Sequence, residues 1–113
     1  MQSFVKELKS AYEIEDFGVR INGHIHTKSG IKMSIQCSQN HYCYPRETID
    51  IDLYSSFELA LLFENDFVYP KSLKDFDRVE ELEEHYEMGI FLYVPKDLVE
   101  DLYNYLNSIE EAK

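Results

Sequence analysis

The chain has 113 residues, of which 44% are hydrophobic and 14% aromatic, a composition that excludes disorder and indicates a single domain over residues 1–113. Twenty-two acidic residues against eleven basic ones give a net charge of −11, and residues 64–113 carry fourteen of those acids and five of the bases. Such a chain repels nucleic acid and anionic membranes, so we expect neither to bind it directly. If charge drives binding, the partner is basic; the alternative is that the acidity serves solubility alone.

No apolar run approaches the roughly 20 residues of a membrane-spanning helix. The N-terminus has neither the basic nor the apolar region of a secretory signal, so we expect a cytoplasmic protein. In that compartment Cys37 and Cys43 are expected to be free thiols.

The first third of the chain predicts one helix and one hairpin. Apolar residues at helical spacing predict a helix over Ser3–Tyr12, with Ser3 as its N-cap, and Glu13–Asp16 is expected to be a connection. Period-two alternation predicts strands over Phe17–His26 and Ile31–Cys37, joined by a glycine-containing turn at Thr27–Gly30.

The middle of the chain predicts a second hairpin after an irregular stretch. Ser38–Ser55 has no clear period and contains Pro45, although alternation over Ile49–Leu53 allows a short edge strand. The apolar run Phe57–Phe63 suits a central strand, with Phe67–Tyr69 as its partner across a tight turn.

After a linker over Lys71–Asp77, the pattern predicts a short charged helix over Arg78–Met88, ended by Gly89. The run Ile90–Val94 predicts a strand, and Pro95 then starts a helix with one apolar face. The fold class is therefore α+β: an antiparallel sheet of about five strands, made of two hairpins plus a later strand, with an N-terminal helix, a short acidic helix and a C-terminal helix packed on one face.

One candidate for chemistry is a group of imidazoles and thiols around the first hairpin. Four of its five members could surround a zinc ion, but their spacing matches no structural zinc pattern, and no nucleotide or phosphate motif occurs. Cys43 beside His41 lacks an acid to orient the imidazole for nucleophilic chemistry. We therefore predict no cofactor, no metal and no catalytic residue, and keep a small metal- or thiol-dependent enzyme as the alternative, centred on His24, His26, Cys37, His41 and Cys43.

The favoured candidate is the acidic run over residues 75–87. On one helix, Glu80, Glu84 and Glu87 would share a face and present carboxylates to basic side chains as a phosphate backbone does. The alternative is an ordinary solvated helix face. Exposed tyrosines supply contact area at low entropic cost, so three of them are candidate anchors. The predicted partner-binding residues are Asp75, Asp77, Glu80, Glu81, Glu83, Glu84, Glu87, Tyr42, Tyr44 and Tyr86.

Two resemblances bear on function. Ile35–Ser38 followed by His41–Glu47 resembles a stretch found in small proteins of phages and mobile elements of Gram-positive bacteria, and Gly89–Leu106 resembles their C-terminal ends. Together these segments cover about a third of the chain. By size, charge and tyrosine content, the chain also resembles the anti-CRISPR inhibitors of such phages, many of which occupy the nucleic-acid groove of an RNA-guided nuclease.

These resemblances imply a phage- or mobile-element-encoded inhibitor acting in the cytoplasm of a host bacterial cell. We therefore expect a non-enzymatic, acidic nucleic-acid mimic that blocks the basic groove of a host defence nuclease, such as an RNA-guided nuclease. A structural or regulatory homo-oligomeric phage protein, in which the Ile49–Leu53 edge or an exposed tyrosine face pairs with a second copy, is a further alternative.

Overall fold

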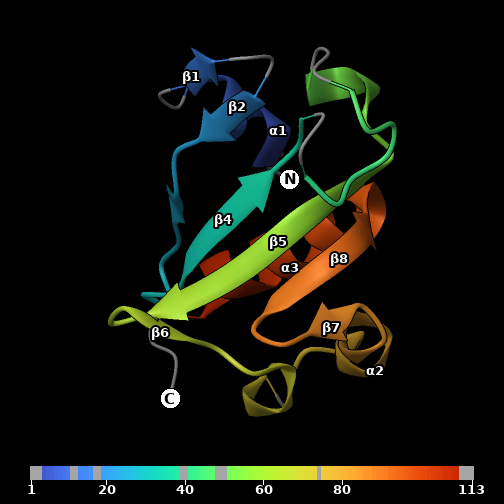
Figure 1. The fold of residues 1–113 in the computed structure, drawn as a ribbon. Coiled ribbons are helices and arrows are strands. Elements are labelled where there is room, and N and C mark those ends of the chain that lie inside the picture. The colour runs from blue at the N-terminus through green and yellow to red at the C-terminus, as the bar shows by residue number, and fades with distance from the viewer. Residues whose placement is uncertain are drawn as a thin grey trace.

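A computed structural model describes residues 4–10, 13–16, 19–38, 41–47, 51–73 and 75–109, with no side chains described for 9–10, 13–16, 19–21 and 52. The described part is an α+β fold, as predicted (Figure 1). Its main sheet is antiparallel in the order β3-β4-β5-β8-β7, and β6 also pairs with β5. The helices are α1 (Phe4–Ser10), α2 (Val79–Glu83) and α3 (Lys96–Ser108); the strands are β1 (Glu13–Asp16), β2 (Val19–Asn22), β3 (Ile25–His26), β4 (Lys32–Gln36), β5 (Ser56–Phe63), β6 (Asp66–Phe67), β7 (Tyr86–Glu87) and β8 (Ile90–Pro95).

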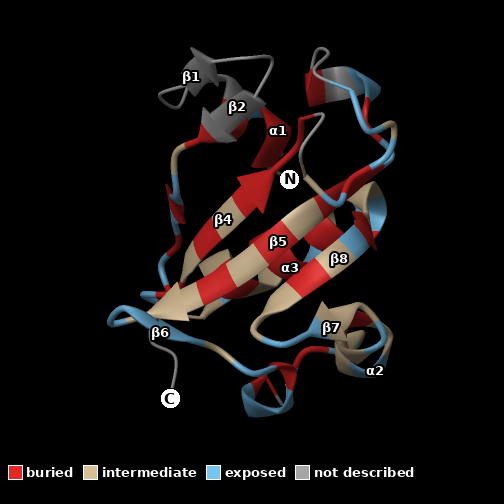
Figure 2. Cartoon of the chain, in the orientation of Figure 1, coloured by how far each residue is buried: buried red, intermediate tan, exposed pale blue. Residues whose placement is uncertain are grey.

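The core lies between the sheet and α3, which crosses behind β5 and β8 in Figure 1. Buried and half-buried residues largely alternate along β4 and β5, because successive side chains of a strand point to opposite faces (Figure 2). The α1 helix packs against α3: the backbone N–H of Phe4 donates to Glu100 at 3.2 Å, and the Tyr103 hydroxyl donates to Glu7. The predicted N-terminal helix is thus confirmed over Phe4–Ser10, while Ser3, its predicted cap, and the predicted last residues 11–12 lie outside the described residues.

The predicted first hairpin is only partly correct. Ile25 and His26 pair with Met33 and Lys32 as expected. However, β2 pairs with β1 in a separate two-stranded sheet, so the expected connection Glu13–Asp16 is a strand.

A side chain joins β2 to β4 where the main-chain ladder does not. The Gln36 amide accepts from the Asn22 N–H at 2.8 Å and donates to the Asn22 carbonyl at 3.0 Å, and Asn22 Nδ2 donates to the Ile35 carbonyl at 3.0 Å. These bonds satisfy buried backbone groups that the hairpin ladder would otherwise have paired.

The second hairpin and the C-terminal elements are confirmed. Leu62 pairs with Phe67 and Phe63 with Asp66, across a turn in which Glu64 and Asn65 have positive φ. The partner strand has two residues, shorter than predicted. The predicted later strand is β8, and the predicted C-terminal helix is α3.

One predicted element is wrong, and the predicted acidic helix is present but shorter than expected. Residues 51–53 form a 3-10 turn, η1 (Ile51–Leu53), instead of the last part of an edge strand; residues 48–50 lie outside the described part. The helix predicted over Arg78–Met88 ends at Glu83, and β7 follows it. Gly89 does not end that helix: with φ of +101° it sits in the turn between β7 and β8.

Candidate protein-binding surface

The predicted acidic helix is shorter than expected, so its predicted residues lie partly on α2 and partly on other elements. Leu82 is fully buried and anchors α2 to the core, while Val79 is half-buried beside it. Glu87 lies on β7, so the predicted face of Glu80, Glu84 and Glu87 does not exist. The remaining predicted acids lie on α2 or just before or after it: Asp75, Asp77, Glu80 and Glu84 are exposed, and Glu81 and Glu83 are half-exposed.

Arg78 joins this acidic segment to the start of α3. Its guanidinium donates to both carboxylate oxygens of Glu81, at 2.9 and 2.5 Å. The same group donates to Asp101 at 2.6 Å and to Asp97 at 3.0 Å. The Arg78 guanidinium thus bonds to three carboxylates from two helices, because its several N–H donors can reach different acceptors at once.

These bonds shift the pKa of both partners in the direction that favours the charged form. Hydrogen bonds to Glu81 and then to Asp101 raise the pKa of Arg78 above its already high ordinary value. The hydrogen bond from Arg78 lowers the pKa of Glu81 below the usual range of a carboxyl. Both groups are therefore fully charged at neutral pH.

Beside this arginine lies an open groove of about 460 Å³. The rings of Phe76 and Tyr105 pack at 5.2 Å between centroids and form its aromatic part. Burial, followed by the charge of Asp75, raises the pKa of Tyr105, so the hydroxyl stays neutral. The groove is lined by Asp75, Phe76, Asp77, Arg78, Asp101, Asn104, Tyr105 and Ser108.

We define the acidic surface as this groove with the adjoining acids of α2 and α3. Its charged members are Asp75, Asp77, Arg78, Glu80, Glu81, Glu83, Glu84, Asp97 and Asp101, which carry eight negative charges and one positive charge. Asp97 and Asp101 were missing from the predicted site residues. Their i, i+4 spacing and the isolated cation Arg78 in an acidic run were the available signals.

The predicted tyrosine anchors do not form one group. Tyr42 and Tyr44 are 40% and 66% exposed, and Arg46 lies over the Tyr42 ring at 4.9 Å from its centroid. Tyr42 also contacts Tyr93 edge-on, at 6.0 Å between ring centroids. Tyr86 instead packs against Tyr69 and Phe91, at 6.0 and 5.1 Å.

A bulge in β8 positions Tyr93 next to Tyr42. Phe57 pairs with Val94 and Leu59 with Phe91, so β8 has one extra residue between these pairs. Tyr93 has a φ of +53°, and its N–H donates to the Tyr42 carbonyl at 3.1 Å instead of to β5. A left-handed conformation at a non-glycine residue costs about 1–2 kcal/mol, so surrounding contacts must hold it in place.

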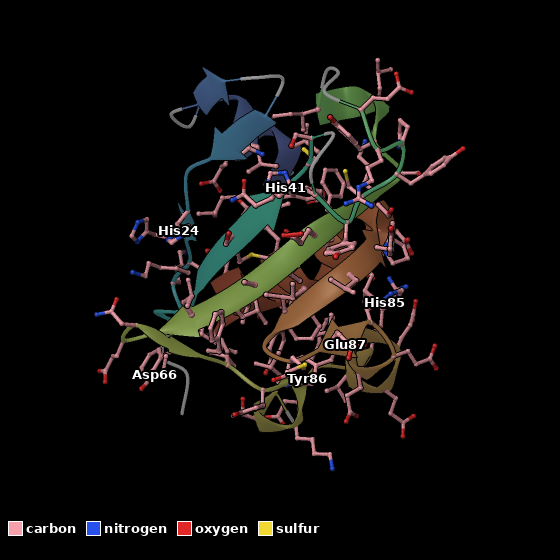
Figure 3. All side chains as sticks on the ribbon, viewed as in Figure 1. His24, His41, Asp66, His85, Tyr86 and Glu87 are labelled. Atoms are coloured by element: carbon pink, nitrogen blue, oxygen red, sulfur yellow. The ribbon has the colours of Figure 1, made fainter. Side chains whose placement is uncertain are left out.

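The imidazoles and thiols of the alternative hypothesis are spread over different environments. His24 and His26 are exposed on the first hairpin, whereas the side chains of Cys37 and Cys43 are fully buried. His41 lies apart from His24 in Figure 3, and its Nδ1 is 2.7 Å from the Ser38 hydroxyl.

Within the described ranges, no three His, Cys, Asp or Glu side chains are grouped to hold a metal ion. Although His24 is exposed as a residue, partial desolvation of its imidazole by neighbouring groups, then the charges of Lys32 and His26, lowers its pKa. Its imidazole is therefore less readily charged than an ordinary histidine.

Comparisons with protein-family models, with curated proteins and with solved structures gave no match for this chain. None of the described helices is long and apolar enough to cross a bilayer.

Proposed function

We propose that this chain is a non-enzymatic binding protein whose acidic surface docks onto a basic surface of another protein. The observation that carries the proposal is the convergence of acids from two helices on Arg78, beside an open groove. A partner's lysines and arginines would meet carboxylates whose positions are already fixed, which lowers the entropic cost of binding.

The groove also supplies the apolar contact that a stable interface needs. The half-buried Tyr105 ring, which packs on the buried Phe76, provides aromatic area next to the carboxylates of the groove. Aromatic and charged groups side by side are typical of the residues that dominate binding energy.

We further propose that the partner is a nucleic-acid-binding nuclease of a host defence system, with the chain acting as a phage- or mobile-element-encoded inhibitor of anti-CRISPR type. A basic groove that binds phosphates offers the lysines and arginines that carboxylates pair with, so an acidic protein can compete for it. The resemblance of Ile35–Ser38, His41–Glu47 and Gly89–Leu106 to phage and mobile-element proteins supports the same source.

Charge reversal tests the proposal. Asp77→Lys with Glu80→Lys changes two exposed acids on either side of Arg78 and leaves the three ion pairs of that arginine in place. The matched control is Glu47→Lys with Glu87→Lys, which makes the same change of net charge at exposed positions outside the acidic surface.

Wild type and both double variants are used as bait in pull-downs from a bacterial lysate across a salt series. We expect a basic partner that is retained by wild type and the control, lost with the Asp77/Glu80 variant, and released at high salt. Equal capture by all three baits contradicts the proposal.

A further inference from the structure

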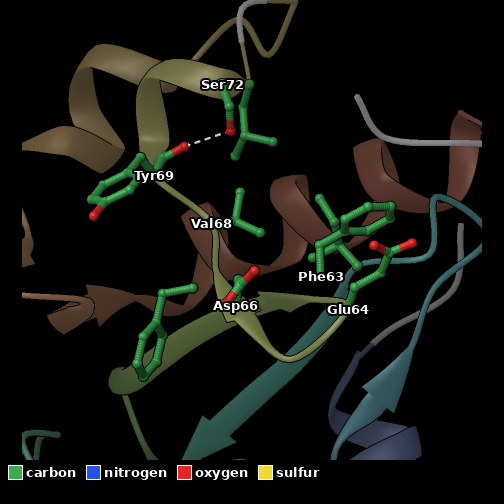
Figure 4. Close-up of a pocket in the computed structure, with 9 residues that line it drawn as sticks. Phe63, Glu64, Asp66, Val68, Tyr69 and Ser72 are labelled. Atoms are coloured by element: carbon green, nitrogen blue, oxygen red, sulfur yellow. Dashed lines mark hydrogen bonds between the residues drawn. The ribbon is translucent and has the colours of Figure 1, made fainter.

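A second cavity, of about 270 Å³, lies between the end of β5 and η2 (Pro70–Ser72). Figure 4 shows Phe63 and Glu64 on one side of it, and Asp66, Val68 and Tyr69 on the other. The cavity shares no residue with the acidic surface. Its lining residues are Ile31, Phe63, Glu64, Asp66, Phe67, Val68, Tyr69, Ser72 and Leu73.

The walls of this cavity are mainly apolar. Ile31 and Leu73 are 1% and 3% exposed and belong to the core, so they form a fixed base. Phe67 and Tyr69 are instead 52% and 65% exposed, and exposed apolar groups that lie together mark interaction sites. An apolar group entering the cavity would cover these two rings.

Among the described residues that line the cavity, the polar side chains leave only negative charge available. The Ser72 hydroxyl donates to the Tyr69 carbonyl at 2.7 Å and is satisfied. Glu64 and Asp66 are exposed, have no ion-pair partner within the described ranges, and lie on opposite sides of the cavity (Figure 4). No lysine, arginine or histidine is among the described residues that line it.

We propose that this cavity binds an arginine side chain of a protein partner. The aliphatic stem of an arginine would contact the apolar base, and its planar guanidinium would stack on an exposed ring. Guanidinium N–H donors point in several directions, so one group can serve carboxylates on two opposite walls.

The size of the cavity agrees with that occupant. Pockets for drug-sized ligands usually have volumes of about 300–1,000 Å³, and this cavity lies just below that range, which suits a single long side chain. The inference relies on the proposed function only in taking the ligand to come from a protein. The residues it uses are different, so the two can fail separately.

The test uses short peptides and NMR. Acetyl-Gly-Arg-Gly-amide is titrated into the isotope-labelled full chain, next to the same peptide with citrulline, which has the same shape without the charge, and the same peptide with lysine. We expect the arginine peptide to shift amide resonances of residues 63–73. The affinity of the citrulline peptide should be about tenfold lower than that of the arginine peptide, or lower still, because charge-assisted hydrogen bonds are stronger than neutral ones. The lysine peptide should also bind more weakly than the arginine peptide.

Isosteric variants locate the binding. Glu64→Gln with Asp66→Asn removes both charges at exposed positions and should reduce arginine-peptide affinity about tenfold or more, with the amide spectrum outside the cavity unchanged. Asp77→Asn with Glu80→Gln, in the acidic surface, should leave the affinity within about twofold. Equal binding of arginine and citrulline peptides, full affinity in the Glu64/Asp66 variant, or shifts confined to the acidic surface would each overturn the inference, whatever the pull-down shows.

Discussion

The turn between β7 and β8 predicts a stabilising substitution. Glu87 pairs with Ile90, and both residues between them have positive φ, +47° at Met88 and +101° at Gly89. That geometry belongs to the two-residue hairpin turn that asparagine-glycine forms most readily. Met88 is 93% exposed, so replacing its side chain removes little packing.

The expected gain for Met88→Asn follows from the backbone. A left-handed conformation costs an ordinary residue about 1–2 kcal/mol, and asparagine avoids part of that cost. We expect the free energy of unfolding to rise by about 0.5–1 kcal/mol, which shifts the melting temperature of a domain of this size by about 2–4 °C.

The assay is urea unfolding followed by circular dichroism, with Gly89→Ala as the opposite control. A Cβ built on Gly89 would lie 3.6 Å from the Phe67 ring, an ordinary contact, so the cost of that change comes from the backbone. Gly89→Ala should lower the free energy of unfolding by about 1 kcal/mol or more. If Met88→Asn is neutral or destabilising while Gly89→Ala is tolerated, the turn does not have this geometry.

Three further predictions concern other parts of the chain. Leu82→Ala should lower the free energy of unfolding by about 2–5 kcal/mol in urea unfolding, because the side chain that fixes α2 is fully buried. Burial, followed by the hydrogen bond to Glu7, raises the pKa of Tyr103. Above a pH of about 10 the folded state therefore keeps a proton that the unfolded state releases, so the free energy of unfolding should fall as the pH rises. In melting curves recorded against pH, Tyr103→Phe should reduce that fall. Cys37 and Cys43 should react with a thiol reagent only as fast as the protein opens, and rapid labelling of the folded chain would contradict their burial.

Strong local patterns were enough to predict most of the sheet and α3. The apolar run Phe57–Phe63 and the run Ile90–Val94 have the composition of buried strands, and both are strands. Prediction failed where one local pattern fits two structures. Val79, Leu82 and Tyr86 have helical spacing, yet the chain leaves the helix before Tyr86 because Tyr86 and Phe91 pair across a turn.

The hairpin turn was missed for a physical reason. Its first position holds Met88, a residue with no preference for positive φ, so the sequence lacks the usual signal and Gly89 alone suggested the end of a helix.

The alternation over Phe17–His26 was misleading for another reason. It has the period of a single strand, but the backbone N–H and carbonyl of Asn22 bond to the side chain of Gln36 instead of to a neighbouring strand of that hairpin.

The candidate site was predictable in composition and not in arrangement. The acidic run predicts a charged surface wherever it folds, and most of its predicted acids are exposed or half-exposed. The link between Arg78 and Asp101 spans 23 residues, and no local pattern encodes such a contact.

The central claim is that the acidic surface competes with nucleic acid for a basic protein groove. The most direct measurement is displacement of a fluorescent DNA or RNA duplex from the captured partner as the chain is titrated in, at two salt concentrations. We expect displacement by wild type and by the Glu47/Glu87 control, loss of displacement with the Asp77→Lys, Glu80→Lys variant, and weaker displacement at the higher salt concentration. Competition would be contradicted if the partner binds the chain and its nucleic acid at the same time. It would also be contradicted if the Asp77/Glu80 variant displaces the nucleic acid as well as wild type does.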